Sequence, residues 1–208
     1  MEWFSTLSLA LGSAWTSGIN LYATVTVLGL LEKFGATNLP GGLDVLNNWW
    51  IIGFAGGLFL VEFFADKIPY VDSVWDVIHT FIRIPAGAVV AYAATNHLDP
   101  KIYVIATLLG GGLAFASHGT KAAARVAANF SPEPVSNWAL SFAEDGVAII
   151  GVVLAVFAPM VIFTILIIFT LLFIWLMPKV LRAIRNLFRA VAGFFRGESF
   201  AEVARKAG

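Results

Sequence analysis

A run of 31 residues, from Val147 to Met177, contains no charged side chain. At about 1.5 Å per residue, a single helix of that length would exceed the roughly 30 Å hydrocarbon core of a bilayer by half. Proline disfavours the helical conformation in the residue before it and removes one backbone donor, so we expect the run to divide at Ala158-Pro159. The run therefore predicts two consecutive membrane helices, with one long kinked helix as the alternative.

Apolar segments recur along the rest of the chain. Hydrophobic residues make up 59% of the 208 residues and charged residues 12%, whereas soluble domains carry roughly 45–50% and about 25%. This composition excludes an ordinary water-soluble globule. We predict an all-α, polytopic transmembrane bundle of about six helices, with five as the alternative. The expected spans are Ser5–Leu31, Trp49–Phe64, Ser73–Thr95, Ile102–Ala127, Trp138–Phe157 and Met160–Met177.

The C-terminal residues carry the main basic cluster, because 7 of the 13 Lys and Arg residues lie between Lys179 and Lys206. A helix over 179–196 would have basic residues on one side and apolar residues largely on the other, which is typical of an interfacial helix on anionic head groups. We therefore predict a transmembrane helical domain, 1–178, and a cytoplasmic basic amphipathic tail, 179–208. The tail is interpreted as a topological anchor, with a regulatory or partner-docking role as the alternative.

Basic residues beside membrane helices favour the cytoplasmic side. With six helices, the basic tail predicts that both termini and Lys67 are cytoplasmic, and that only Lys33 and Lys101 face outwards. The first 32 residues contain no Lys or Arg, unlike a secretory leader, which opens with a basic segment. We therefore interpret the N-terminus as a retained helix.

A shift of 63 positions aligns two segments of the chain without a gap and places Trp75 on Trp138. Each segment would form a helical hairpin with two crossings, so the two hairpins would run parallel, related by an axis along the membrane normal. The same shift places Glu62 on Arg125. These two side chains would either form an ion pair near that axis or face separate partners.

Charged and polar side chains recur at helical spacings inside the predicted spans, where each charge costs a few kcal/mol on insertion. Residues at such spacings share one helical face, and a charged face cannot contact lipid. We predict that these faces line a hydrophilic cavity or an ion path, with a structural ion-pair network or a place at head-group level as the alternatives. The candidate residues are Asn20, Glu62, Asp66, Asp76, His79, Arg83, His118, Lys121, Arg125, Glu144 and Asp145.

His79 and His118 need separate consideration, because imidazole titrates near neutral pH and ligates metals. Either one could join Asp76, Glu144 or Asp145 in a site for a divalent cation, but no spacing matches a defined metal motif. We interpret both as hydrogen-bonded polar histidines and leave a metal undecided. No cofactor is predicted.

The first span is interrupted by small and polar residues, among them Gly18 and Asn20. Gly and hydroxyl residues at this depth permit close packing of helices, which is the interpretation that we favour. The alternative is a broken helix whose freed backbone groups bind a substrate. The triplet Gly110–Gly112 in the fourth span invites the same two interpretations, and packing is favoured more strongly there.

Several kinds of chemistry lack support in the sequence. The chain has no Cys, which excludes disulfides, thiolate metal sites and Cys nucleophiles. No phosphate-binding loop and no Gly-x-Ser-x-Gly motif occurs. No platform of basic and aromatic side chains supports nucleic-acid binding. We therefore predict neither an enzyme nor a nucleic-acid partner.

Five longer strings carry a family resemblance, and together they span most of the chain, roughly Leu7 to Trp175. With them, the chain resembles the bacterial membrane family numbered 4126 among domains of unknown function. The resemblance implies an integral protein of the bacterial inner membrane and implies no activity. The strings are Ser17–Thr24, Val61–Pro69, Trp75–Arg83, Pro85–Ala88 and Ser131–Trp138.

The function that these observations favour is that of a small channel or secondary transporter, with a charged intramembrane cavity for a cation, a proton or a small solute. Its expected partners are the lipid bilayer and that solute. Because a bundle of only six helices is small, a homo-oligomer is also compatible with the sequence. The alternatives are a non-transporting scaffold or accessory subunit, and a lipid-handling protein.

Overall fold

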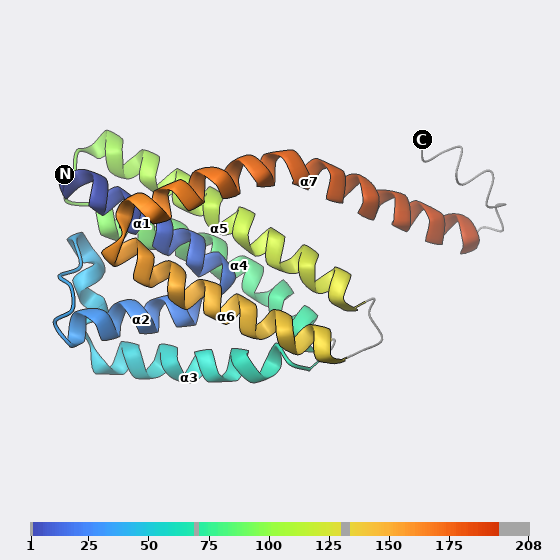
Figure 1. Ribbon diagram of the computed structural model, residues 1–208, viewed down its shortest axis with the longest axis horizontal. Coiled ribbons are helices and arrows are strands. Elements are labelled where there is room, and N and C mark those ends of the chain that lie inside the picture. The colour runs from blue at the N-terminus through green and yellow to red at the C-terminus, as the bar shows by residue number, and fades with distance from the viewer. Residues whose placement is uncertain (1, 69–70, 130–133, 196–208) are drawn as a thin grey trace. The chain divides into compact units, whose positions relative to one another are not determined.

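The computed structural model describes residues 2–68, 71–129 and 134–195 (Figure 1). All secondary structure in these ranges is helical, so the predicted all-α class is confirmed. The chain divides into two compact units, residues 1–167 and 168–208. The helices are α1 (Glu2–Ile19), α2 (Leu21–Lys33), the short 3-10 helix η1 (Gly41–Leu46), α3 (Trp49–Ala65), α4 (Val71–Thr95), α5 (Pro100–Asn129), α6 (Pro134–Phe157) and α7 (Pro159–Phe195).

Four helices in the described part of the chain are long and apolar enough to cross a membrane, which makes this a membrane-embedded protein. They cover Val74–Thr95, Pro100–Ala128, Val135–Phe157 and Pro159–Ala183. A fifth apolar helix, Trp49–Ala65, has 17 residues and is shorter than the roughly 20 residues of a usual crossing. The predicted number of six crossings is not confirmed.

The long uncharged run divides where the sequence predicts. α6 ends at Phe157 and α7 begins at Pro159. The carbonyl oxygen of Ala158 accepts hydrogen bonds from the N–H groups of Val161, at 2.9 Å, and Ile162, at 3.1 Å, and so starts α7. Proline is tolerated in the first helical position, because the N–H that it lacks would have no partner there. The two-helix interpretation is confirmed.

The expectation of one crossing over Ser5–Leu31 is wrong. Asn20 separates α1 from α2 and has an extended backbone, with φ of −146° and ψ of 100°. The chain turns back there: Glu2 and Asn38, which lie before and after the two helices, line the same small pocket, and Figure 1 shows α1 entering and α2 leaving at one end of the unit. The segment is a helical hairpin with Asn20 at its tip.

The hairpin also removes the argument that placed both termini on one side of the membrane. That argument counted residues 5–31 as a crossing, whereas the two ends of the hairpin lie at the same end of the unit. The start of α1 therefore lies at the same end of the unit as Lys33, not at the opposite end. Hydropathy did not reveal this difference, because a single non-helical residue hardly changes the mean over a span.

α1 is the central helix of the first unit. It packs against α4, α5 and α6, and every residue from Ser8 to Ile19 is buried. A Cβ atom added at Gly12 would lie 2.8 Å from Cβ of Ala155, and one at Gly18 would lie 2.8 Å from Cα of Ala114. The packing interpretation of the interrupted span is therefore confirmed, and its helix also breaks at Asn20, whereas binding of a substrate by the freed backbone groups stays a prediction.

Small residues also bring α4 and α5 together over much of their length. A Cβ atom added at Gly110 would lie 2.5 Å from Cβ of Ala91 and 3.0 Å from the carbonyl oxygen of Gly87. The packing interpretation of the glycine triplet is therefore confirmed for Gly110. Gly112 is exposed, and a Cβ atom there would meet no described atom within 4 Å.

The helix boundaries agree with the 63-residue shift. α4 begins at Val71 and α6 begins at Pro134, 63 positions later, while α3 ends at Ala65 and α5 at Asn129. Figure 1 shows that α3 and α5 end, and α4 and α6 begin, at the same end of the first unit. A parallel repeat of two related hairpins stays a prediction.

The second unit contains the rest of α7, which continues through Pro178 to Phe195. The predicted tail helix is therefore helical but is not separate from the preceding membrane helix. Nζ of Lys179 lies 3.1 Å from the ring centroid of Trp175, and Lys179, Arg182, Arg185 and Arg189 are exposed. Residues 196–208, Arg196 included, lie outside the described residues.

Candidate functional site

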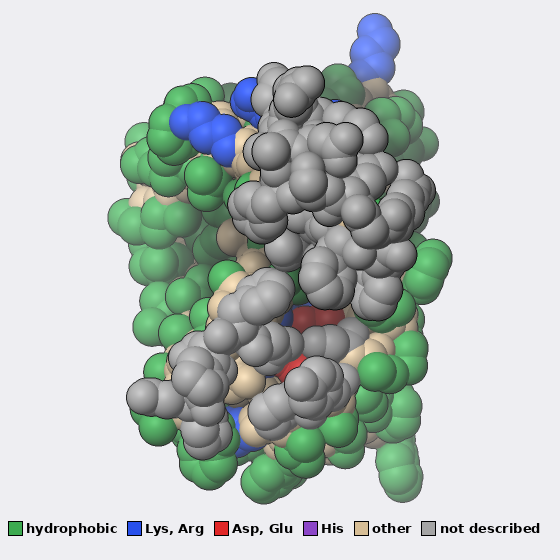
Figure 2. Space-filling model, turned by 90° about the vertical axis from the view of Figure 1, so that its right-hand side faces the viewer, with side chains coloured by type: hydrophobic (Ala, Val, Ile, Leu, Met, Phe, Trp, Pro, Cys, Tyr) green, Lys and Arg blue, Asp and Glu red, His purple; other side chains and the backbone are tan. Residues whose placement is uncertain are grey.

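The charged residues of the spans meet inside the first unit, at the end where α3 and α5 end and α4 and α6 begin. Figure 2 looks onto this end and shows hydrophobic side chains around the outside and a few acidic side chains near the middle. The structure brings all eleven candidate residues together and buries each of them. We define the charge cluster as Glu62, Asp66, Asp72, Asp76, Arg83, Lys121, Arg125, Glu144 and Asp145.

Arg83 on α4 holds two carboxylates and is completely buried. Its Nη2 atom lies 2.5 Å from Oε1 of Glu62, and its Nη1 atom lies 3.0 Å from Oδ1 of Asp76. Because both partners are buried as well, each ion pair is made in a low-dielectric interior, where removing one partner is costly. Arg83 thus connects α3 to α4.

Lys121 on α5 joins the cluster to the broken hairpin. Its Nζ atom lies 3.0 Å from Oδ2 of Asp66 and 3.3 Å from Oε1 of Glu62, and it donates to the carbonyl oxygen of Ile19 at 3.3 Å. In a continuous helix that carbonyl would accept from the N–H of Ala23. Here the Ala23 N–H donates to the Asn20 side chain instead, so the break frees the carbonyl for Lys121.

Arg125 on α5 holds α3 and α6. Its Nε and Nη2 atoms bind the two carboxylate oxygens of Glu144, at 3.2 and 2.5 Å, in the bidentate geometry that gives the strongest ion pairs. Nη2 also lies 2.9 Å from Oδ2 of Asp66, and Nη1 donates to the Asp66 carbonyl at the end of α3. Asp72 is 3.7 Å away from Nη1.

The sequence left open whether Glu62 and Arg125 meet. Both lie in the charge cluster, but Glu62 pairs with Arg83 and Lys121, and Arg125 pairs with Asp66, Asp72 and Glu144. The two side chains therefore face separate partners, which was the second of the two interpretations.

Asp145 on α6 differs from the other carboxylates of the cluster. Its Oδ1 atom accepts a hydrogen bond of 2.9 Å from Nδ2 of Asn20, and its Oδ2 atom is buried without a hydrogen-bond partner in the described part of the chain. Each of the other five carboxylates lies within 4.0 Å of an Arg or Lys nitrogen, whereas no such ion pair of Asp145 occurs among the described residues. The Asp145 carboxylate therefore depends on Asn20, at the hairpin tip, for its described hydrogen bond.

The charges of the cluster do not balance. Among the described residues, the six carboxylates of the cluster outnumber its three cations, Arg83, Lys121 and Arg125, so three negative charges are in excess when every carboxyl group is ionised. Glu62, Asp66 and Asp76 each also have one buried carboxylate oxygen without a hydrogen-bond partner in the described ranges. Because an uncompensated buried charge is costly, this excess favours the binding of protons or another cation.

Lys67 lies at the edge of the cluster, just after α3. Its Nζ atom lies 3.0 Å from the ring centroid of Phe63 and 3.3 Å from Oγ of Ser141. Burial lowers the pKa of the Lys67 ammonium below that of a free lysine, while the nearby Asp145 and Asp66 carboxylates oppose this shift. Even with Lys67 counted, carboxylates outnumber cations.

Both histidines are hydrogen-bonded through both ring nitrogens, as the sequence favoured. Nδ1 of His79 lies 2.7 Å from the carbonyl oxygen of Trp75, which makes Nδ1 the protonated nitrogen, and Nε2 lies 2.9 Å from the Tyr22 hydroxyl. Nδ1 of His118 lies 3.2 Å from Nη1 of Arg83, which can only donate, and Nε2 lies 2.7 Å from Oγ1 of Thr80. This pairing assigns the neutral form to His118, because Nδ1 accepts from Arg83 and Nε2 donates to Thr80, whose hydroxyl donates to the Asp76 carbonyl.

The histidines therefore have no free nitrogen to offer a metal. Among the described residues, no group of three or more His, Asp or Glu side chains has the arrangement of a metal site.

Three residues of the site were not among the sequence candidates. Tyr22 bonds His79, Thr80 bonds His118, and Asp72 lies beside Arg125. The spacing of four residues already places Asp72 on the same charged face as Asp76, and a place at head-group level was the alternative for it. Tyr22 and Thr80 have no such signal, since uncharged hydroxyl residues are common in membrane helices.

Replacing Asn20 with alanine is expected to destabilise the protein more than replacing Asn48. Each asparagine caps a helix through its side-chain oxygen, Asn20 at Ala23 and Asn48 at Trp50, and loss of such a cap costs about 1 kcal/mol. Asn20→Ala also removes the only described donor to Asp145, which adds roughly 1–3 kcal/mol. Unfolding of the two variants in mixed micelles measures the difference, and equal losses would contradict it.

No curated protein and no solved structure matches the chain significantly. The profile of one family, described as "Domain of unknown function (DUF4126)", matches residues 7–179. That range includes every residue of the charge cluster and the helical hairpin α1–α2 from Leu7 onward. The chain therefore belongs to the DUF4126 family.

Proposed function

We propose that this protein is a small proton-linked transporter or channel of the bacterial inner membrane, in which Asp145 binds and releases a proton. The observation that carries the proposal is the Asp145 carboxyl group, which is buried, lacks an ion pair in the described ranges and is held by Asn20. An ionised carboxylate in such a place costs far more free energy than a protonated one. A change in the protonation of Asp145 is therefore coupled to its hydrogen-bond partner Asn20.

The helical hairpin supports the same proposal. Discontinuous helices in transporters place helix ends and freed backbone groups at a site near the middle of the membrane. Here the break at Asn20 presents its amide to Asp145 and the carbonyl oxygen of Ile19 to Lys121. Protonation of Asp145 would weaken the contact with Asn20, and so bias the position of the hairpin tip.

The extent of ion pairing favours a second candidate, a non-transporting scaffold or accessory subunit. Five of the six carboxylates have a cationic partner, and a paired cluster can serve structure alone. This candidate predicts that the purified protein moves no protons. In neither candidate is the protein an enzyme.

Proton flux into proteoliposomes distinguishes these candidates. With an imposed membrane potential and a pH dye inside, the wild-type protein is expected to carry flux, and Asp145→Asn to lower it about tenfold or more, as expected when an essential proton carrier is removed. Asp44→Asn, at an exposed aspartate of η1, is the matched control and is expected to retain the flux. Asp145 is preferable to Asp76 or Glu144, because those two carboxylates are ion-paired and their loss also affects folding.

Two results would contradict the proposal. Flux of Asp145→Asn equal to that of the wild type would exclude Asp145 as the proton site. Wild-type flux no higher than that of protein-free liposomes would favour the scaffold instead.

The structure also changes the orientation that we propose. If α3 to α7 each cross the membrane and α1–α2 is re-entrant, the basic tail and Lys67 are cytoplasmic, and the start of α1 lies outside with Lys33 and Lys101. The exposed basic residues of α7 would then anchor its end to anionic head groups. Cysteine labelling of Lys33→Cys and Lys67→Cys from each side of the membrane tests this orientation.

A further inference from the structure

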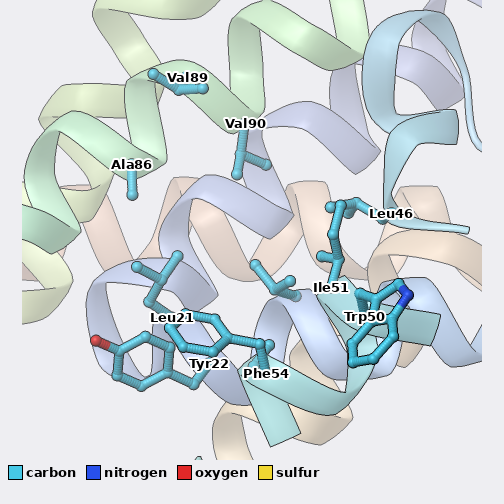
Figure 3. Close-up of a pocket in the computed structure, with 11 residues that line it drawn as sticks. Leu21, Tyr22, Leu46, Trp50, Ile51, Phe54, Ala86, Val89 and Val90 are labelled. Carbon is cyan, nitrogen blue, oxygen red and sulfur yellow. The ribbon is translucent and has the colours of Figure 1, made fainter. Parts of the chain in front are cut away.

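An apolar pocket of about 560 Å³ lies between α2, α3 and α4. α2 forms its floor with Leu21 and Tyr22, and Trp50 and Phe54 of α3 face Ala86 of α4 across it (Figure 3). α3 and α4 follow each other in the chain but contact each other only sparsely. Side chains therefore leave the space between them unfilled.

The pocket opens on a surface that lies among hydrocarbon chains when the protein is in a bilayer. Trp50 is 87% exposed, Phe54 72% and Val89 62%. All its lining residues are apolar apart from the Tyr22 hydroxyl and the Trp50 indole, and the Tyr22 hydroxyl already bonds His79. The lining offers little to a polar solute and suits a hydrocarbon chain.

One end of the pocket lies at the level of the lipid head groups. Trp49 and Trp50 begin α3, and tryptophan is enriched at the membrane–water interface. Lys33, at the end of α2, places its Nζ atom 5.4 Å from the Trp49 ring centroid. The other end of the pocket, at Leu21, is about 18 Å away along α2, close to the roughly 15 Å from head groups to bilayer centre.

We propose that this pocket binds one acyl chain of a membrane phospholipid, with the lipid phosphate beside Lys33. The apolar lining matches the chain, the length of α2 matches its course from interface to bilayer centre, and the Lys33 ammonium complements the phosphate charge. This site is separate from the proton-binding role of Asp145 and does not depend on it.

A photoactivatable phosphatidylglycerol, with its reactive group near the end of one acyl chain, tests the site in proteoliposomes of the full chain. Cross-links are expected in residues 21–25 and 86–90, mapped by mass spectrometry of peptides. Ala86→Phe, which fills the pocket, is expected to lower this labelling about tenfold, which corresponds to the loss of roughly two buried methylene groups. Ala139→Phe, at an exposed alanine of α6, is the matched control and is expected to leave labelling unchanged.

A fatty alcohol with the same reactive group distinguishes a phospholipid from any apolar ligand. It is expected to label the pocket less than phosphatidylglycerol does, and Lys33→Gln is expected to reduce only the labelling by phosphatidylglycerol. Equal labelling by both probes would overturn the phospholipid assignment. Labelling spread evenly over the membrane face, or unchanged in Ala86→Phe, would overturn the pocket.

Folding of the variants is checked by size exclusion and helicity. If Ala86→Phe does not fold, Val89→Trp at the open mouth of the pocket replaces it, because that side chain is already largely exposed. Undiminished labelling in folded Val89→Trp overturns the proposal in the same way.

Discussion

Arg83→Met is expected to lower the free energy of unfolding by about 3–5 kcal/mol, the cost of leaving the partners of a buried cation unpaired. Arg83 and Glu62 are both fully buried, and the Asp76 side chain is 6% exposed. Methionine keeps most of the volume of arginine and removes the charge. Reversible unfolding in mixed micelles, followed by helicity, measures the loss.

The neutral double variant Arg83→Met/Glu62→Gln serves as the critical comparison. It is expected to recover part of the lost stability, because Glu62 no longer carries an unpaired charge, although Asp76 keeps only its more distant partner Lys121, at 3.6 Å. Lys101→Met, at an exposed lysine of α5, controls for the loss of a positive charge and is expected to change stability little. Equal stability of Arg83→Met and the control would mean that the cluster does not hold the bundle together.

Gly18→Ala is expected to destabilise the protein by roughly 1–3 kcal/mol, the usual cost of overpacking a dense interior. The added Cβ would lie 2.8 Å from Cα of Ala114 and would clash with the Ala114 carbonyl oxygen and the Ser117 hydroxyl. Since two of these atoms are backbone, α1 and α5 would have to move apart.

Gly112→Ala is the matched control for this change. Gly112 is also helical, but a Cβ there meets no described atom within 4 Å, so alanine is expected to raise stability by up to about 1 kcal/mol through helix propensity. The same unfolding measurement compares the two variants. A Gly18→Ala protein as stable as Gly112→Ala would show that α1 is not closely packed.

Much of the charge cluster could be predicted from the sequence, because helical spacing decides which residues share a face. Asp76, His79 and Arg83 follow one another at intervals of three and four, and a charged face must avoid lipid. The division at Ala158 was also predictable, since proline has a strong local effect. The family resemblance is confirmed by the profile match over residues 7–179.

The rest of the site depends on contacts between residues far apart in the chain. The break at Asn20 is stabilised by Asp145, which lies 125 positions later, and no local pattern reveals that partner. The same reason hid the pairing of Arg125 with the end of α3 and the contact of Tyr22 with His79. Spacing predicts which residues leave the lipid, but only the packing of the helices decides which of them meet.

The central place of α1 has a consequence for how the protein is made. α1 is synthesised before the helices that it packs against, and these extend to Phe157 at the end of α6. At about 5–20 residues per second, the last of these neighbours is synthesised on the order of ten seconds later. Until then the amide of Asn20 lacks its partner Asp145. The final packing of the N-terminal hairpin is therefore complete only after α6 has been synthesised.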